Sequence, residues 1–293
     1  NQTLTASPLG VRVDTPTPAA HLLGIKQMAS DGKGDQRKIL AEWMVSPRNP
    51  WFARNLVNRY WSEFFGRGIV DPVDDVRATN PPSNPELLDA LAKHFDEVNY
   101  DLKKLIRTIV LSRTYQTASK PNDTNAKDEQ NFSRALFRRP DAEVILDMIT
   151  HTLGVPEKFE GMPLGTRAIQ LWDNKTKSYF LKTMGRPSRS TVCECERATE
   201  PNLASVLHLL NSDTVSGKLQ HENGMVARFS STINNDDELI EEMYLLFYSR
   251  PPSDKEKQQV REHIQKGGAG NRRRCIEDIA WAFVNTKEFL FNR

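Results

Sequence analysis

The residue types best suited to chemistry stand close together in the middle of the chain. Cys193 and Cys195 are two of the three cysteines in the 293 residues, and Glu194 and Glu196 alternate with them. If residues 192–197 are extended, the period of two places both thiols on one face, about 6.6 Å apart at Cα, and both carboxylates on the other. Two thiols on one face could form a disulfide, bind a metal or take part in redox chemistry.

Each of these chemistries needs more than the pair supplies. A Cα separation of this size lies at the outer edge of disulfide geometry, so a direct bridge requires a local bend. A structural zinc site has four ligands, and only Cys275 and a histidine could complete one around Cys193 and Cys195. No C-x-x-C-H sequence occurs, so the usual attachment motif for c-type haem is missing. The sequence favours inert, buried thiols and predicts no cofactor, with a disulfide or a zinc or other metal site at this pair as alternatives.

A second group of acidic residues follows an aromatic stretch in the first third of the chain. Asp71, Asp74 and Asp75 cluster beside Arg67 and Arg77, an arrangement that could bind a cation or act as a general acid or base. The spacing lacks the alternating acids and central glycine of an EF-hand loop, so turn capping and ion pairing with the arginines are favoured. The weak catalytic candidates are the charged residues of both groups: Asp74, Asp75, Glu194, Glu196 and Arg197.

Four histidines stand singly inside predicted helices, without a second histidine four residues later or a paired glutamate. They are His94, His151, His208 and His263. Because zinc hydrolases carry paired ligands at helical spacing, each histidine is interpreted as structural. Gly66 and Gly68 follow a helix rather than a strand, so they are not a nucleotide-binding fingerprint.

Aromatic and basic residues complete the set of candidates. Trp172 and Tyr179 lie in a segment rich in glycine and proline, where aromatic rings can stack on sugars, but packing onto the helices is the favoured use. Arg272, Arg273 and Arg274 begin a predicted helix, where the helix dipole disfavours cations. We expect an acidic neighbour, Asp278 or a residue of another segment, to offset them.

Composition limits the classes of partner. Lys and Arg number 40 against 38 Asp and Glu, giving a formal net charge of +2, far from the basic excess of nucleic-acid-binding proteins. No run of about 18 apolar residues could span a bilayer. No signal peptide is visible before Ala20, and the start at Asn1 is interpreted as a processing boundary. We expect neither nucleic-acid binding nor a membrane span.

Apolar periodicity predicts a series of helices that position these residues. Each combines apolar residues three or four positions apart with a capping or terminating signal. The predicted helices cover about 35–44, 50–65, 84–97, 101–110, 141–153, 201–210, 236–249, 253–266 and 271–286. Residues 116–131 are polar and loop-like. The sequence therefore predicts an all-α, compact multi-helix domain.

The helical period disappears after Gly154, where glycines and prolines interrupt short apolar clusters. This long irregular insert is expected to be packed rather than disordered and could hold one or two short strands. Cys193 and Cys195 would lie beneath it, beside the helix that begins at Pro201. The expected organisation is a linker or tail of an upstream domain over 1–34 and a single helical domain over 35–293, made of an N-terminal half (35–154), the insert (155–200) and a C-terminal half (201–293).

Several short phrases occur together and in order along the chain. They are Asn49–Arg54, Val57–Trp61, Phe65–Val70 with Asp74 and Asp75, Asn84–Asp89, Tyr115 and Gln116, Arg138 and Arg139 with Ala142 and Glu143, and Leu209–Asn211. As a set they resemble the planctomycete C-terminal domain of unknown function family 1553, over about 35–293. The resemblance implies a domain near the end of a large exported protein, periplasmic or at the cell surface, usually after a second uncharacterised domain and often a c-type cytochrome domain. It implies no established activity, and Cys193–Arg197 departs from the commoner pattern.

Two classes of function follow from these observations. No catalytic constellation is complete, the charge is balanced and the helices are amphipathic, which favours a non-catalytic docking or scaffolding module. Its expected partners are the upstream domains of the parent protein, or a cell-surface protein or carbohydrate. The alternative is an enzyme or redox module, set in polysaccharide processing, with a site on the 155–197 insert near Asp74 and Asp75. The sequence leaves open whether the protein is an enzyme.

Overall fold

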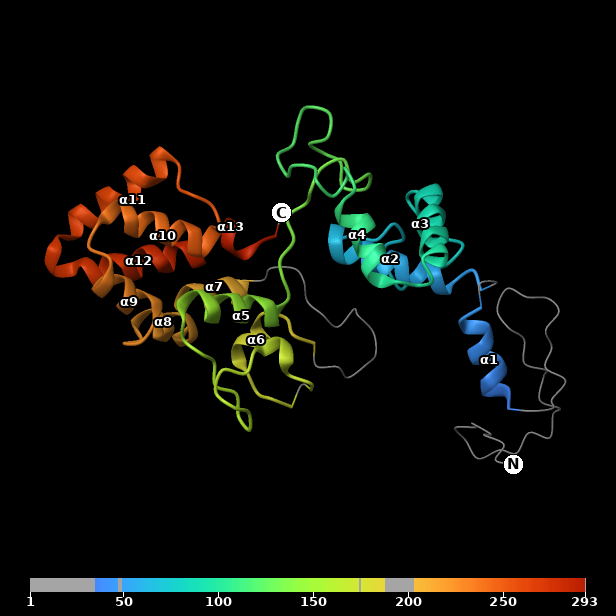
Figure 1. The fold of residues 1–293 in the computed structure, drawn as a ribbon, viewed down its shortest axis with the longest axis horizontal. Helices are drawn as coiled ribbons and strands as arrows, with labels where there is room; N and C mark the ends of the chain where they lie inside the picture. The colour runs from blue at the N-terminus through green and yellow to red at the C-terminus, as the bar shows by residue number, and fades with distance from the viewer. Residues whose placement is uncertain (1–34, 47–48, 174, 188–202, 293) are drawn as a thin grey trace. The chain divides into compact units, whose positions relative to one another are not determined.

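The computed structural model describes residues 35–46, 49–173, 175–187 and 203–292, and their regular structure is almost entirely helical (Figure 1). Within these ranges, the one pairing of extended segments is an isolated antiparallel bridge between Arg138 and Asn292. The predicted all-α fold class is confirmed.

The chain forms two compact units. The first ends at Thr117 and also includes Lys127–Ser133, and the second consists of Ala118–Ala126 and Arg134–Arg293. The exchange between them falls largely in the stretch predicted as a polar loop, 116–131. Loss of helical period marks the insert in the sequence, but it does not mark where one apolar core ends and another begins. The single domain over 35–293 stays a prediction.

The described part of the first unit contains α1 (Gln36–Met44), α2 (Phe52–Phe65), α3 (Pro85–Glu97) and α4 (Leu102–Val110). Their ends follow from local chemistry. Gly66 ends α2 at φ 75°, in the left-handed region that glycine tolerates best. The Asn84 side chain caps α3 by accepting a hydrogen bond from the Leu87 N–H at 3.0 Å, and Asp101 caps α4 in the same way.

One face of α2 packs into the core of the first unit, together with one polar side chain. Val57, Trp61 and Phe65 are buried, at the three- and four-residue spacing expected of a helix. Asn58 is also buried. Its amide donates to the Val70 carbonyl and accepts from the Val70 N–H, both at 2.9 Å. The segment after Gly66 folds back over this face of α2, so the side chain completes backbone hydrogen bonds that the turn lacks.

The second unit holds the rest of the described helices. They are α5 (Ala142–Leu153), η1 (Ala168–Gln170), α6 (Tyr179–Thr183), α7 (Leu203–Asn211), α8 (Asp213–Gln220), α9 (Met225–Thr232), α10 (Asp236–Tyr248), α11 (Asp254–Gly267), η3 (Ala269–Asn271), α12 (Arg272–Val284) and α13 (Lys287–Leu290). Helices α8 and α9 lie where no helix was predicted, because two turns carry too few apolar positions to establish a period. Between 155 and 187, the described residues contain η1 and α6 and no strand.

Helix α12 is central to the second unit, since it contacts α8, α9, α10, α11 and α13. Two of the three arginines at its start have acidic partners. Arg272 forms an ion pair with Asp236 and donates to the Ile233 carbonyl at 3.1 Å, and Arg273 pairs with Glu277 at 3.2 Å. The acidic start of α10 therefore supplies the compensation expected from a neighbouring segment.

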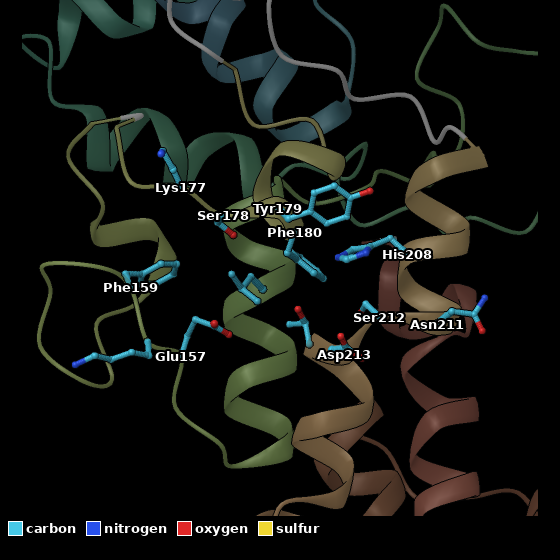
Figure 2. A pocket seen from close by; sticks show the side chains of 13 residues that line it. Glu157, Phe159, Lys177, Ser178, Tyr179, Phe180, His208, Asn211, Ser212 and Asp213 are labelled. Atoms are coloured by element: carbon cyan, nitrogen blue, oxygen red, sulfur yellow. The ribbon is translucent and has the colours of Figure 1, made fainter.

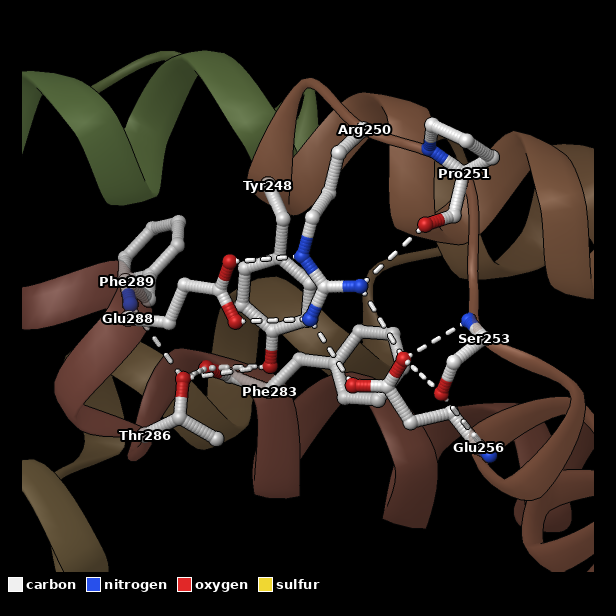
Figure 3. A network of polar contacts seen from close by, with 9 residues as sticks. All are labelled: Tyr248, Arg250, Pro251, Ser253, Glu256, Phe283, Thr286, Glu288 and Phe289. Carbon is white, nitrogen blue, oxygen red and sulfur yellow. Dashed lines mark hydrogen bonds and ion pairs between the residues drawn. The ribbon is translucent and has the colours of Figure 1, made fainter.

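A polar network joins the end of α10 to α11 and α13 (Figure 3). The Arg250 guanidinium donates to Glu288 at 2.7 and 2.8 Å and to Glu256 at 2.8 and 3.0 Å, and it lies over the rings of Tyr244 and Tyr248. These hydrogen bonds lower the pKa of Glu256 to about 2 and raise that of Arg250. Burial raises the pKa of Tyr248 to about 12, so both tyrosines stay protonated at neutral pH.

Candidate functional site

The irregular segment 155–187 is fixed to the helices of the second unit by charged and polar groups. At its start, Lys218 of α8 is buried and donates to the Val155 carbonyl at 2.9 Å while pairing with Glu157 at 2.9 Å. A buried ammonium is tolerated only when its hydrogen bonds and its charge are satisfied. Lys218 therefore holds the first residues of the segment against α8.

The end of the segment is held by a second buried pair. Arg186 forms an ion pair with Glu143 of α5 at 3.1 Å, and their side chains are only 9% and 14% exposed. Arg186 also donates to the Asp173 carbonyl at 2.8 Å, and Arg139 donates to the Met184 carbonyl at 3.0 Å. Arg139 and Glu143 belong to one of the phrases that carry the family resemblance. Their contacts give that phrase a structural role in holding the segment.

A carboxylate on α5 holds the middle of the segment. Asp147 accepts from the Ala168 N–H at 2.6 Å and the Ile169 N–H at 3.3 Å, and it pairs with Arg167 at 3.4 Å. These N–H groups begin η1, where a helix end needs an acceptor. The segment is thus anchored at three places, and its exposed side chains are presented from a fixed backbone.

A pocket of about 480 Å³ opens between this segment and the junction of α7 with α8 (Figure 2). It is lined by three stretches of chain: Glu157, Lys158 and Phe159; Lys177, Ser178, Tyr179 and Phe180; and His208, Asn211, Ser212, Asp213 and Thr214, with Leu146 of α5. Ser178 and Ser212 face the pocket from helix caps, accepting from the Leu181 and Val215 N–H groups at 3.3 Å. The helix starts therefore fix part of its wall.

Three rings gather on one side of the pocket. His208 makes an edge contact with Tyr179 at 5.0 Å between centroids and a tilted contact with Phe180 at 5.4 Å. Burial lowers the pKa of His208, so its ring is neutral at pH 7. Its Nε2 is buried without a hydrogen-bond partner among the described residues. His208 was interpreted as a structural histidine, and here it supports an aromatic wall.

Helix α7 also carries an apolar stripe that faces away from the unit. Leu203, Val206 and Leu207 are 74%, 45% and 49% exposed. Leu210 continues the stripe one turn further and lies next to α12, whose Trp281 indole donates to the Leu210 carbonyl at 3.1 Å. We call Leu203, Val206, Leu207 and Leu210 the α7 stripe.

The aromatic residues of the insert do not pack as the sequence analysis expected. Trp172 is 76% exposed and Tyr179 is 73% exposed. The residues that pack inward are instead Phe159, Leu171, which precedes Trp172, and Phe180, which follows Tyr179. Because the segment has no helical period, its sequence does not indicate which aromatic side chain faces the core.

The acidic cluster of the first unit forms ion pairs. Asp74 pairs with Arg59, Asp75 pairs with Arg77, and Asp71 lies 3.5 Å from Arg67. The hydrogen bond from Arg77 lowers the pKa of Asp75. These contacts match the favoured ion-pair interpretation, except that Asp74 takes Arg59 of α2 as its partner.

The other predicted site residues, Cys193, Glu194, Cys195, Glu196 and Arg197, lie outside the described residues. The metal, disulfide and redox alternatives for them stay predictions. Cys275 is a free thiol buried in α12. Within the part of the chain that the structure describes, no three His, Cys, Asp or Glu side chains gather as metal ligands, and no helix is long and apolar enough to cross a membrane.

Sequence reasoning missed the residues that fix and line the pocket. Lys218 offered one signal, since it stands three residues after Val215 on the apolar side of α8, where a lysine needs a partner. Asn211 closes one of the family phrases, yet nothing in its spacing indicated a pocket.

Three comparisons with known proteins were informative to different degrees. No curated protein and no solved structure matches the chain. The model of the family described as PSD1, protein of unknown function (DUF1553), matches residues 36–264, which confirms the resemblance. The chain therefore belongs to the DUF1553 family.

Proposed function

We propose that this chain is a non-catalytic helical docking module of a larger exported protein, and that its second unit binds a neighbouring domain of the same polypeptide. The supporting observation is the α7 stripe, in which three large apolar side chains are each 45% exposed or more. Exposed apolar groups in a contiguous row favour an interaction surface.

The spacing of the α7 stripe suits a helical or grooved partner. Its residues recur at i, i+3, i+4 and i+7, the pattern by which a helix packs into a groove or against another helix. The opposite face of α7 is used within the unit, where Ser205 and Leu209 are buried. Helix α7 therefore has one face for its own core and a second for a partner.

The size of the α7 stripe favours a partner on the same chain. A stable complex between free proteins buries about 800 Å² on each side, far more than four side chains of one helix provide. A tethered domain is presented at an effective concentration of about 1 mM, so a weak contact is sufficient. A cell-surface protein or a carbohydrate that needs only a small contact is compatible with the same surface.

Hydrogen exchange tests this proposal in the parent protein. Amides of residues 203–211 are expected to exchange at least about tenfold more slowly in the longer polypeptide than in the isolated 293-residue chain, because docking covers α7. Equal exchange rates in the two proteins would overturn the proposal.

Charge substitutions test whether the added protection of the amides depends on the α7 stripe. Leu203→Glu with Leu207→Glu should abolish the added protection, because a carboxylate cannot be buried unpaired at an apolar contact. Leu245→Glu is the matched control, since Leu245 is an exposed leucine on α10 outside the α7 stripe. It should leave the protection intact. Loss of protection in the control alone contradicts the assignment.

The enzyme or redox alternative places its site on the 155–197 insert near Asp74 and Asp75. Its candidate residues 193–197 lie outside the described residues, so that alternative and the exported, cytochrome-associated context of the family stay predictions.

A further inference from the structure

We infer that the pocket between the insert and the α7–α8 junction is a binding site for one neutral sugar unit, free or within a polysaccharide. The inference goes beyond docking and uses different residues of α7. Docking uses Leu203, Val206 and Leu207, whereas His208 and Asn211 line the pocket.

The pocket has the size and accessibility that such a ligand requires. Its volume of about 480 Å³ lies within the range of small-molecule sites, about 300–1,000 Å³. The three anchors at Lys218, Asp147 and Arg186 fix the segment that forms one wall. Because that wall is ordered before the ligand arrives, little conformational entropy is lost on binding.

An exposed ring stands at the rim of the pocket. Tyr179 is 73% exposed, so burial in the unit does not account for it. The ring is held by its edge contact with His208, 5.0 Å away (Figure 2). The C–H face of a sugar ring packs on such an aromatic surface, while the tyrosine hydroxyl remains available for hydrogen bonding. His208 is a positioning residue in this arrangement.

The polar groups around the ring suit hydroxyls. The side chains of Lys158, Lys177, Asn211 and Asp213 make no hydrogen bond or ion pair with another residue that the structure describes. They offer ammonium and amide donors together with amide and carboxylate acceptors, and a sugar hydroxyl can pair with either kind.

Charged groups of both signs line the pocket, and a neutral ligand avoids repulsion by either. Two ammonium groups, on Lys158 and Lys177, stand with the carboxylates of Asp213 and Glu157. Glu157 is already paired with Lys218, and His208 is neutral at pH 7 because its pKa is lowered, so Asp213 is the carboxylate that stands with the two ammonium groups. The like charge of Asp213 repels a phosphate and the ammonium groups repel a strongly cationic ligand, whereas a neutral polyol meets neither repulsion.

Ligand-observed NMR with the intact 293-residue chain tests the inference. The probes are neutral oligosaccharides of glucose, galactose, mannose, xylose and N-acetylglucosamine, with inorganic phosphate and glutamate for comparison. At least one neutral oligosaccharide should bind with a Kd of about 0.1–1 mM, the range of a single shallow contact. Phosphate and glutamate should bind at least about tenfold more weakly.

Variants tie the binding to this pocket. Tyr179→Ala should weaken binding about tenfold or more, while Tyr179→Trp should retain it, because an indole preserves the stacking surface. Trp172→Ala is the matched control, since Trp172 is as exposed as Tyr179 on the same insert but does not line the pocket. It should leave the Kd unchanged.

Three results would overturn the inference: no neutral oligosaccharide bound at about 10 mM, equal affinity in Tyr179→Ala, or tighter binding of phosphate or glutamate. The docking proposal can fail while the sugar inference holds, and the reverse, because different residues carry them. Leu203→Glu with Leu207→Glu should bind the sugar as the unmodified chain does, and Tyr179→Ala should keep the α7 amides protected in the parent protein.

Discussion

Two regions of the second unit are held in place by different forces. In α10–α13, apolar side chains at helical spacing form a continuous core, and the Arg250 network lies near the surface, with the arginine side chain 32% exposed. In the 155–187 segment, buried charges carry much of the attachment. Glu143 and Arg186 are 14% and 9% exposed, and Lys218 is buried against Val155 and Glu157.

This difference has a functional consequence. Shortening an apolar side chain lowers the free energy of unfolding in proportion to the volume removed. Removing the partner of a buried charge lowers it strongly, because the remaining charge stays buried and unpaired. Charged anchors also leave the outer surface of a segment unconstrained. The insert can therefore expose Trp172 and Tyr179 and line a polar pocket while its backbone stays fixed.

The largest effect is expected at the pair between Glu143 and Arg186. Glu143→Ala should lower the free energy of unfolding by about 3–5 kcal/mol, because the Arg186 guanidinium is left buried without its counter-ion. Denaturant titration followed by circular dichroism measures the loss. A change below about 1 kcal/mol would show that the pair is effectively solvated and would remove the contrast between the two regions.

A double variant separates charge from packing at the same place. Glu143→Leu with Arg186→Met should recover most of the lost stability, since apolar side chains of similar size replace a buried ion pair with little cost. If the double variant is as unstable as Glu143→Ala, the hydrogen bond from Arg186 to the Asp173 carbonyl is the dominant contact instead.

A smaller effect is expected in the apolar packing of the C-terminal helices. A Cβ at Gly267 would overlap the Cys275 Sγ, so Gly267→Ala should cost about 1–3 kcal/mol, and Cys275→Ala should relieve part of that cost. Gly217→Ala is the matched control. Nothing lies within 4 Å of its Cβ position in α8, so it should stabilise by about 0.5–1 kcal/mol. Equal thermal shifts for the two glycine variants would contradict tight packing between α11 and α12.

The Arg250 network should respond to pH in a defined window. The pKa of Glu256 falls from 4.5 to about 2 on folding, so its contribution is complete above about pH 4.5 and is lost as pH falls toward 2. Glu256→Gln should lower stability by about 1 kcal/mol at neutral pH, since the group is partly exposed. Melting temperatures of both proteins should converge as pH falls from about 4.5 to about 2. If the difference between the two melting temperatures stays constant over this range, the Glu256 carboxylate is not the source of that difference.

The elements that could be predicted from the sequence are those whose determinants are local. The buried face of α2 at Val57, Trp61 and Phe65 involves residues within a few positions of one another, and so does the Asn84 cap at the start of the helix predicted over 84–97. A capping box at Ser253 and Glu256 begins the helix predicted over 253–266. Short-range geometry decides all of these, so a period and a cap were sufficient.

The attachment of the insert could not be predicted, because its determinants are distant in sequence. Lys218 and Val155 are 63 residues apart, and Arg139 and Met184 are 45 residues apart. The pocket likewise combines three separate stretches of chain. The sequence could only identify Arg139 and Glu143 as parts of a phrase and Tyr179 as an aromatic residue on an irregular segment. The fold class is a consequence of repeated local patterns, whereas the candidate site exists only after the core has formed.

The smallest effect is expected at the outer surface of the insert, where a buried and an exposed residue are neighbours in the chain. If the charged anchors hold the segment, an exposed ring adds little, so Trp172→Ala should change the free energy of unfolding by less than about 0.5 kcal/mol. Leu171, the adjacent residue, is buried, and Leu171→Ala should cost about 2–4 kcal/mol. Denaturant titration of this neighbouring pair compares the two faces of one short segment. A loss of more than about 1 kcal/mol in Trp172→Ala would mean that the indole covers the core after all, and the outward face of the insert would then lose its interpretation as a binding surface.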